Sequence, residues 1–173
     1  MGVLKLSKTN AAFTEQQFSD RLMACKEKLY RFAFSYVKNE QDAIEIVSEA
    51  SYKAFLSYKK LKDPDYFETW MTRIVINSAI DHIQRKKKYT YIEDCETPFM
   101  VKESGITLEE QWDLYEALDY LSPKDKTFII LKFFEGQRFK DMAEVLSISE
   151  NTVKSRFYRI LDKLKRQMTT EEG

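Results

Sequence analysis

The chain has 173 residues, 43% of them hydrophobic and 32% charged, a balance that is typical of soluble globular proteins. Only 4 Gly and 3 Pro occur, which argues against an all-β fold with many tight turns and predicts an all-α chain. The formal net charge is zero, but the charges are unevenly distributed. Residues 1–90 hold 16 basic and 11 acidic side chains and residues 121–173 hold 11 basic and 8 acidic ones, whereas residues 91–120 hold 1 basic and 9 acidic ones. Only the two outer, net basic blocks can therefore face a polyanion without repulsion.

The N-terminal part is predicted to be helical. Residues 1–13 carry no periodic pattern and are expected to be disordered. Residues 14–90 form the predicted N-terminal domain, in which apolar residues recur at steps of three and four. Its three helices are expected over residues 14–38, 42–61 and 66–88, with a turn at 62–65.

The second of these helices has one acidic side with an apolar residue inside it. That side is shared by Asp42, Glu45, Ile46, Glu49, Tyr52 and Lys53. A solvated helix face would look like this, and so would a docking face in which an exposed isoleucine ringed by carboxylates meets a basic protein partner. The residues alone leave these two interpretations open.

The third helix is expected to bury two sides and to leave a mixed polar strip between them. The strip and the basic cluster that follows it contain Trp70, Arg73, Asn77, Asp81, Gln84, Arg85, Lys86, Lys87 and Lys88. A basic cluster at this place also complements the helix dipole, and a lone Trp is more often a core residue. Cations beside an aromatic ring and an amide can equally follow a single nucleic-acid strand.

The periodic pattern breaks after Tyr89, and residues 91–107 are predicted to be a flexible acidic linker. Periodicity returns at Leu108, so residues 108–168 are predicted to form a C-terminal helical domain. Ser122-Pro123 is typical of a helix start, and Gly136 is typical of a helix end. Two further helices are expected over residues 139–146 and 150–167.

These last two helices, separated by Ser147-Ile148-Ser149, have the order of a helix-turn-helix. A helical projection of the second gives one apolar stripe, formed by Val153, Phe157, Ile160, Leu161 and Leu164. The remaining sides carry Asn151, Thr152, Lys154, Ser155, Arg156, Tyr158 and Arg159. A merely solvated face usually carries more Glu, whereas base edges and phosphates require such donors and acceptors. The pattern therefore favours binding to duplex DNA.

Several other classes of protein do not fit the sequence. His82 is the only histidine and has no nucleophile or metal-ligand spacing around it, and no glycine-rich phosphate loop occurs, so no catalysis, metal or cofactor is expected. Cys25 and Cys95 follow no metal spacing and are expected to be reduced. No apolar run of membrane-spanning length and no signal-peptide pattern is found, so a cytoplasmic location is expected.

Two groups of motifs resemble the extracytoplasmic-function group of bacterial sigma factors. Residues 42–49 (DAIEIVSE) are similar to the DAEDLVQE helix of that family, and residues 67–82 resemble its FxxWLxRIAxNxAIDH pattern. Leu121-Ser-Pro123, Phe134-Glu-Gly136, residues 142–146 and residues 148–156 resemble its second domain. The resemblance covers roughly residues 18–167, with both halves in the order of the family.

The resemblance implies a protein that binds core RNA polymerase, directs it to promoters and helps to open the DNA. It implies polymerase docking around Asp42, Glu45, Ile46 and Glu49, on clamp helices that are basic. It implies minus-ten recognition by Trp70, Arg73, Asn77, Asp81, Arg85, Lys86 and Lys87, with the loop at residues 61–66. It implies minus-thirty-five recognition by residues of the last helix, namely Asn151, Thr152, Lys154, Ser155, Arg156, Tyr158 and Arg159. An anti-sigma protein is a further expected partner, and the acidic linker is expected to follow the polymerase's RNA path.

The sequence also departs from the family pattern. Ser48 stands where the family usually has Gln, at an expected polymerase contact, while Asn151 replaces Gly and Ile76 replaces a frequent Arg. The main alternative is a helix-turn-helix regulator whose N-terminal half senses a ligand or dimerises. Such a regulator would bind its operator without polymerase.

Overall fold

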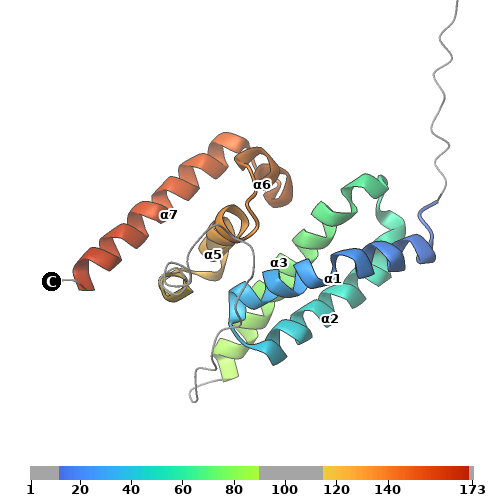
Figure 1. The fold of residues 1–173 in the computed structure, drawn as a ribbon, viewed down its shortest axis with the longest axis horizontal. Helices are drawn as coiled ribbons and strands as arrows, with labels where there is room; N and C mark the ends of the chain where they lie inside the picture. Colours follow the sequence, from blue (N-terminus) through green and yellow to red (C-terminus); the bar gives the residue numbers. More distant parts are fainter. Residues whose placement is uncertain (1–11, 90–114, 172–173) are drawn as a thin grey trace, which may run out of the picture.

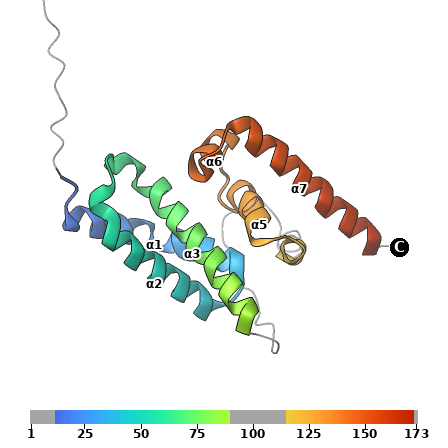
Figure 2. The same cartoon turned by 180° about the vertical axis from the view of Figure 1, so that it is seen from behind.

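The computed structural model describes residues 12–89 and 115–171, and within these two ranges every regular element is helical. The predicted all-α fold class is therefore confirmed. Figures 1 and 2 show two groups of helices side by side, with α1–α3 in one and α5–α7 in the other. None of the helices described is long and apolar enough to cross a membrane.

Three long helices form the N-terminal group: α1 (Glu15–Val37), α2 (Glu40–Ser57) and α3 (Phe67–Tyr89). Thr14 caps α1 in a reciprocal capping box with Gln17, as expected from its hydroxyl at this position. Lys38 ends α1 in a left-handed conformation, and the side chain of Asn39 then caps α2, so the two helices turn back on each other within two residues. Two short 3₁₀ turns, η1 (Tyr58–Lys60) and η2 (Pro64–Tyr66), connect α2 to α3.

The C-terminal group begins with helical residues 115–119, followed by α5 (Pro123–Ile129), a π-helical turn η3 (Ile130–Phe134), α6 (Phe139–Leu146) and α7 (Glu150–Glu171). Ser122 caps α5 and Pro123 takes its first position, as predicted. Gly136 has φ = 60°, a conformation that glycine adopts without steric cost. The predicted glycine stop is therefore confirmed, although the last turn before it is π-helical.

Phe13 corrects the expectation that residues 1–13 are disordered. Its side chain is buried, and its ring centroid lies 6.0 Å from that of Phe67 and 6.1 Å from that of Tyr58. The chain is thus fixed in the core one residue before the cap of α1, because a single aromatic side chain buries enough apolar surface to hold it. Residues 1–11 and the predicted linker at 91–107 lie outside the described residues.

The two groups of helices contact each other through specific polar bonds. The hydroxyls of Tyr36 on α1 and Thr127 on α5 share a buried hydrogen bond. Lys38 donates to the backbone carbonyl of Tyr115, and its ammonium lies 3.1 Å from the carboxylate of Asp119. These contacts join the groups into one packed body with a continuous core.

A mostly buried carboxylate also lies at this junction. Burial raises the pKa of Glu135, and the cations of Lys28 and Arg31 on α1 counteract that shift. The Glu135 carboxylate lies 3.8 Å from the Lys28 ammonium. The contact between the two groups of helices is therefore partly ionic.

Candidate nucleic-acid interface

The helix-turn-helix is formed by α6 and α7, and its apolar stripe is buried as predicted. Val153, Phe157, Ile160 and Leu164 are all buried, and Leu161 is half-buried against the same core. Ser147 turns the chain with φ = 55°, and the hydroxyl of Ser149 accepts a hydrogen bond from the backbone N–H of Thr152. This cap and stripe fix the rotation of α7 about its own axis.

The other sides of α7 are open. Asn151, Lys154, Ser155, Arg156, Tyr158 and Arg159 are exposed, and Thr152 is half-buried. The Tyr158 ring lies 6.1 Å from Phe139 and 5.6 Å from Phe157, so a packed aromatic cluster holds its base while its hydroxyl faces solvent. Lys154 forms an ion pair with Glu150 one turn earlier, at 3.1 Å. The face therefore offers hydrogen-bonding groups and cations on a rigid helix, as binding in a major groove requires.

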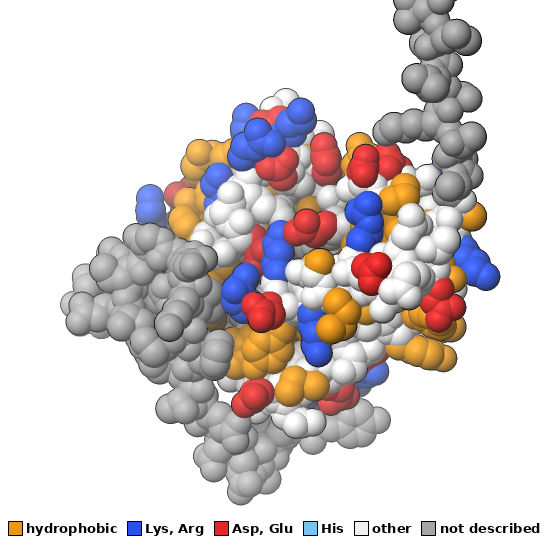
Figure 3. Space-filling model, turned by 45° about the vertical axis from the view of Figure 1, so that its right-hand side comes forward, with side chains coloured by type: hydrophobic (Ala, Val, Ile, Leu, Met, Phe, Trp, Pro, Cys, Tyr) orange, Lys and Arg blue, Asp and Glu red, His pale blue; other side chains and the backbone are white. Residues whose placement is uncertain are grey.

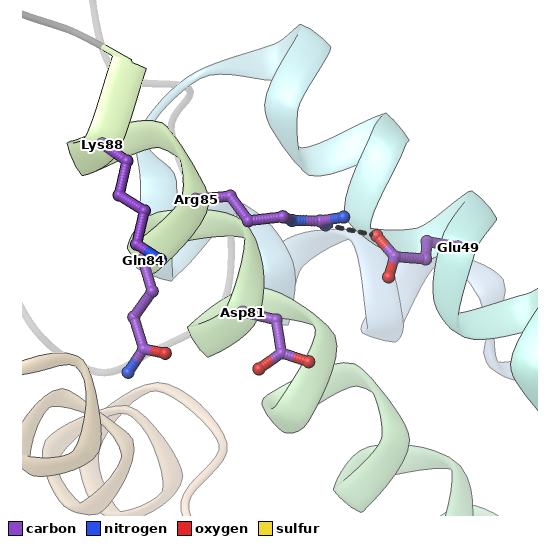
Figure 4. A pocket seen from close by; sticks show the side chains of 5 residues that line it. All are labelled: Glu49, Asp81, Gln84, Arg85 and Lys88. Carbon is purple, nitrogen blue, oxygen red and sulfur yellow. Dashed lines mark hydrogen bonds and ion pairs between the residues drawn. The ribbon is translucent and has the colours of Figure 1, made fainter.

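The C-terminal half of α3 carries a second exposed polar surface. Asn77, Asp81, Gln84 and Arg85 are exposed, and Lys86, Lys87 and Lys88 follow them. A shallow pocket of about 280 Å³ lies here between α2 and α3, lined by Glu49, Asp81, Gln84, Arg85 and Lys88 (Figure 4). Figure 4 shows Arg85 reaching from α3 across to Glu49 on α2. Carboxylates, an amide and cations at one opening suit the edge and phosphate of a nucleotide.

Two residues of the predicted strip do not lie on this surface. Arg73 donates from Nε to the backbone carbonyl of Val145 at 2.8 Å and from Nη2 to that of Glu144, so its guanidinium binds the C-terminal end of α6. Trp70 is half-buried against the core, with its ring 5.9 Å from Phe67. Both side chains are placed by packing partners, and the strip that remains open begins at Asn77.

Ile46 was expected to be exposed among carboxylates, and that expectation is wrong. Ile46 is 0% exposed, and it shares a buried stripe of α2 with Ala43, Ala50 and Ala54. The small alanines allow α1 and α3 to pack closely on α2, which buries a wider side of α2 than a single partner would. The isoleucine between them therefore belongs to the core.

The exposed apolar side of α2 is a different one, and of its residues only Tyr52 was assigned to the candidate docking side from the sequence. Ile44 is 46% exposed, Tyr52 64%, Phe55 44% and Leu56 65%. At about 100° per residue, Ile44, Tyr52 and Phe55 fall within about 80° of one another, and Ser48 falls between them. Figure 3 shows exposed apolar side chains among acidic and basic ones on one face of the molecule. Four large apolar side chains on one solvated helix face are typical of a protein interface.

The carboxylates of α2 border this apolar face on the side of α3. Glu45 is exposed, whereas Asp42 and Glu49 are half-buried and bind cations of α3. Hydrogen bonds from Lys53 and Arg85 lower the pKa of Glu49, so it stays ionised. The predicted acidic side of α2 is therefore present, but Ile46 is not part of it.

One group of side chains could in principle hold a metal. Potential ligand atoms of Asp42, Glu45 and His82 lie within 4.8 Å of one another. However, the Nε2 atom of His82 lies 3.3 Å from Asp42 Oδ1, and the ammonium of Lys86 occupies the other oxygen of that carboxylate. One of the three candidate ligands, Asp42, is therefore already paired with a cation of the chain.

Comparisons with known proteins match both halves of the chain. The family described as Sigma-70 region 2 matches residues 22–89, and the family described as Sigma-70, region 4 matches residues 111–164. The chain is 39% identical over 147 residues to "RNA polymerase sigma factor SigV" of Bacillus subtilis (strain 168), with 85% of this chain and 88% of the relative covered. It is 27% identical over 169 residues to "ECF RNA polymerase sigma factor SigW" of the same strain, with 89% and 90% covered.

Solved structures show the same fold. The chain matches the sigma factor RpoE, in complex with the anti-sigma factor NepR from Bartonella quintana, with a TM-score of 0.68 at 21% identity, covering 89% of this chain and 98% of that one. It matches CnrH, in complex with the cytosolic domain of CnrY, with a TM-score of 0.64 at 21% identity, covering 91% and 90%. The helical arrangement in Figure 1 is thus shared over nearly the whole length.

Proposed function

The chain belongs to the ECF group of RNA polymerase sigma factors, and we propose which of its surfaces carry out that function. As a sigma factor it binds core RNA polymerase and directs promoter-specific initiation of transcription, a regulatory role rather than an enzymatic one. The observation that carries the proposal is the pair of exposed polar helix faces, one on α7 and one on α3, in a single chain.

The upstream element is read by α7. In this proposal Asn151, Ser155 and Tyr158 face base edges in the major groove, while Lys154, Arg156 and Arg159 bind phosphates or guanine edges. Thr152 is half-buried and bonded to the Ser149 cap, so it supports the first turn of the helix. The minus-thirty-five element is the DNA expected at this face.

The downstream element is bound by the C-terminal half of α3. Asn77, Asp81 and Arg85, with Lys86 and Lys87, are proposed to hold the non-template strand of the minus-ten element once it is unpaired. The surroundings of Arg73 and Trp70 give these two residues a supporting role, because both side chains are engaged with protein partners. Capturing an unpaired base offsets the few kcal/mol that unstacking that base costs, and so contributes to promoter opening.

The polymerase is proposed to dock on α2. The exposed apolar face formed by Ile44, Tyr52, Phe55 and Leu56 supplies the buried centre of this interface. Three carboxylates border this face: Asp42, Glu45 and Glu49. Their negative charge complements a basic partner, and the polymerase clamp helices that bind this family are basic. Ser48 lies within the apolar face, where the family usually has Gln, so this position is proposed to contact the polymerase directly.

Replacing Tyr52 and Leu56 by alanine is expected to weaken binding to core polymerase by about tenfold or more, because central apolar side chains carry most of an interface's energy.

Charge reversal at Glu45 and Glu49 is expected to weaken the same binding to core polymerase. Titration of labelled protein with core polymerase measures both effects. Met23→Ala with Met168→Ala is the matched control, since it removes two apolar side chains that are also more than half exposed, from α1 and α7. Equal affinities for control and test variants would contradict the docking face.

The complete function is tested by comparing DNA binding with and without core polymerase. The chain alone is expected to bind duplex DNA weakly, and the complex is expected to protect both promoter elements from cleavage. Run-off transcription on a genomic library then identifies the promoters that it uses. Tight, sequence-specific binding of a duplex by the free chain would instead support an ordinary helix-turn-helix regulator.

The regulation of the chain is proposed from its relatives. The solved structures of RpoE and CnrH are complexes with NepR and with the cytosolic domain of CnrY, and NepR is described as an anti-sigma factor. We infer that an anti-sigma protein also holds this chain until a stress or envelope signal releases it. Its place of action is then the cytoplasm, with the polymerase.

A further inference from the structure

Ion pairs join α2 and α3 along the edge where the two proposed binding surfaces meet. Arg85 on α3 donates to Glu49 on α2 at 2.7 Å, as Figure 4 shows. Lys86, the next residue of α3, binds the carboxylate of Asp42. Lys53 of α2 lies 2.7 Å from the same Glu49 carboxylate and 3.9 Å from Asp81.

Two of these pairs between the helices, Arg85–Glu49 and Lys86–Asp42, each join a polymerase-docking carboxylate to a DNA-binding cation. Glu49 and Asp42 belong to the proposed docking surface, whereas Arg85 and Lys86 belong to the proposed minus-ten surface. The side chains of Glu49 and Asp42 are only 25% and 14% exposed, so water competes poorly for them. In the free chain each surface therefore neutralises charge that the other needs.

We propose that these two pairs couple polymerase binding to capture of the single strand. A cation of the polymerase that binds Glu49 or Asp42 releases Arg85 or Lys86 toward a DNA phosphate. Without the polymerase, a phosphate that takes Arg85 leaves the half-buried Glu49 with Lys53 as its remaining cation. A phosphate that takes Lys86 removes the ammonium that binds Asp42. Both losses cost free energy. The inference rests on the proposed function and adds a reason why the free chain is a poor binder of promoter DNA. Because coupling is reciprocal, the single strand also raises the affinity for polymerase by the same factor.

The test uses the full-length chain without polymerase and a short fluorescein-labelled oligodeoxythymidine as the single-stranded probe. Asp42→Asn with Glu49→Gln keeps the shape of both side chains and removes their charge. This variant is expected to bind the probe about tenfold more tightly than the unchanged chain, which lies within the usual range of coupling factors. Its plot of log affinity against log salt is expected to be steeper by about 1.4, since each additional phosphate contact on a single strand contributes about 0.7.

The matched control is Glu27→Gln with Glu40→Gln, which removes two exposed carboxylates from α1 and from the first turn of α2. It changes the net charge equally, and it is expected to leave the salt slope unchanged. Glu49→Gln alone is a second variant that leaves the first turn of α2 intact, with an expected slope change of about 0.7. Circular dichroism confirms that each variant is folded.

The outcomes separate this inference from the function on which it rests. If the double variant binds the probe no better than the control and has the same salt slope, the coupling is overturned. Arg85→Ala with Lys86→Ala, measured by run-off transcription with core polymerase, tests the minus-ten surface itself. Unchanged transcription there would overturn the proposed site, whereas reduced transcription together with no gain in the first test would overturn only the coupling.

Discussion

Ile46→Ala is expected to lower the free energy of unfolding by about 2–5 kcal/mol, as is usual when a fully buried isoleucine is truncated to alanine. The side chain fills the space between three helices, and the neighbouring alanines are too small to close the cavity. Urea denaturation followed by circular dichroism measures the change, which is read from the midpoint at a constant slope.

Ile44→Ala is the control for this measurement, because it makes the same chemical change two residues away on the exposed face. Its stability is expected to stay within about 0.5 kcal/mol of the unchanged chain, while its affinity for core polymerase falls. The two isoleucines thus separate stability from docking. The assignment fails if Ile46→Ala unfolds at the same urea concentration as Ile44→Ala.

Lys154→Ala with Arg159→Ala is expected to reduce transcription from promoters that depend on the minus-thirty-five element by tenfold or more. Contacts to base edges are each worth about 1–3 kcal/mol, and a tenfold change corresponds to about 1.4 kcal/mol. Both side chains are exposed on α7, so their removal leaves the packing of the helix intact. Run-off transcription on templates with the intact and the scrambled upstream element measures the loss.

Lys163→Ala with Lys165→Ala is the corresponding control, since it removes two exposed cations further along the same helix. Its transcription is expected to change little on either template. Binding of core polymerase, measured by pull-down, is expected to be the same for both pairs. Loss of polymerase binding with the Lys154 and Arg159 pair alone would contradict the assignment of α7 to DNA.

The sequence predicted most of the α7 surface because that helix packs on one side only. A single buried stripe from Val153 to Leu164 fixes which residues remain outside, and the cap at Ser149 fixes where the helix begins. The helix start at Ser122 was predicted for a similarly local reason, since a side-chain cap is recognised within four residues.

Predictions failed where partners distant in sequence decide the environment. α2 packs against both α1 and α3, so its buried side is wide, and the contribution of Ala43, Ala50 and Ala54 was not apparent from hydrophobicity alone. Arg73 binds carbonyls 71 and 72 residues further along the chain, which no local pattern indicates. The ion pairs of Glu49 and Asp42 likewise depend on the way α3 lies beside α2.

The contact of Arg73 with the end of α6 also limits how far apart the two DNA surfaces can lie. Arg85 is 12 residues further along α3 than Arg73, a helical distance of about 18 Å. Asn151 is six residues after Val145, so even a fully extended chain places it at most about 21 Å away. Elements centred near minus ten and minus thirty-five are roughly 25 base pairs apart, or about 85 Å at 3.4 Å per step. On the proposed assignment of the minus-ten element to α3 and of the minus-thirty-five element to α7, a chain in this arrangement therefore reaches only one of them at a time.

On the proposed assignment of the two faces, one chain binds both elements only after its two groups of helices have separated. The apparent dissociation constant equals the intrinsic one divided by the fraction of chains that are open, so an interface that leaves about one chain in a hundred open weakens binding about a hundredfold. The bonds made by Arg73, Tyr36 and Lys38 oppose that separation, so on this assignment stronger bonds raise the concentration of the chain that binding to both elements requires.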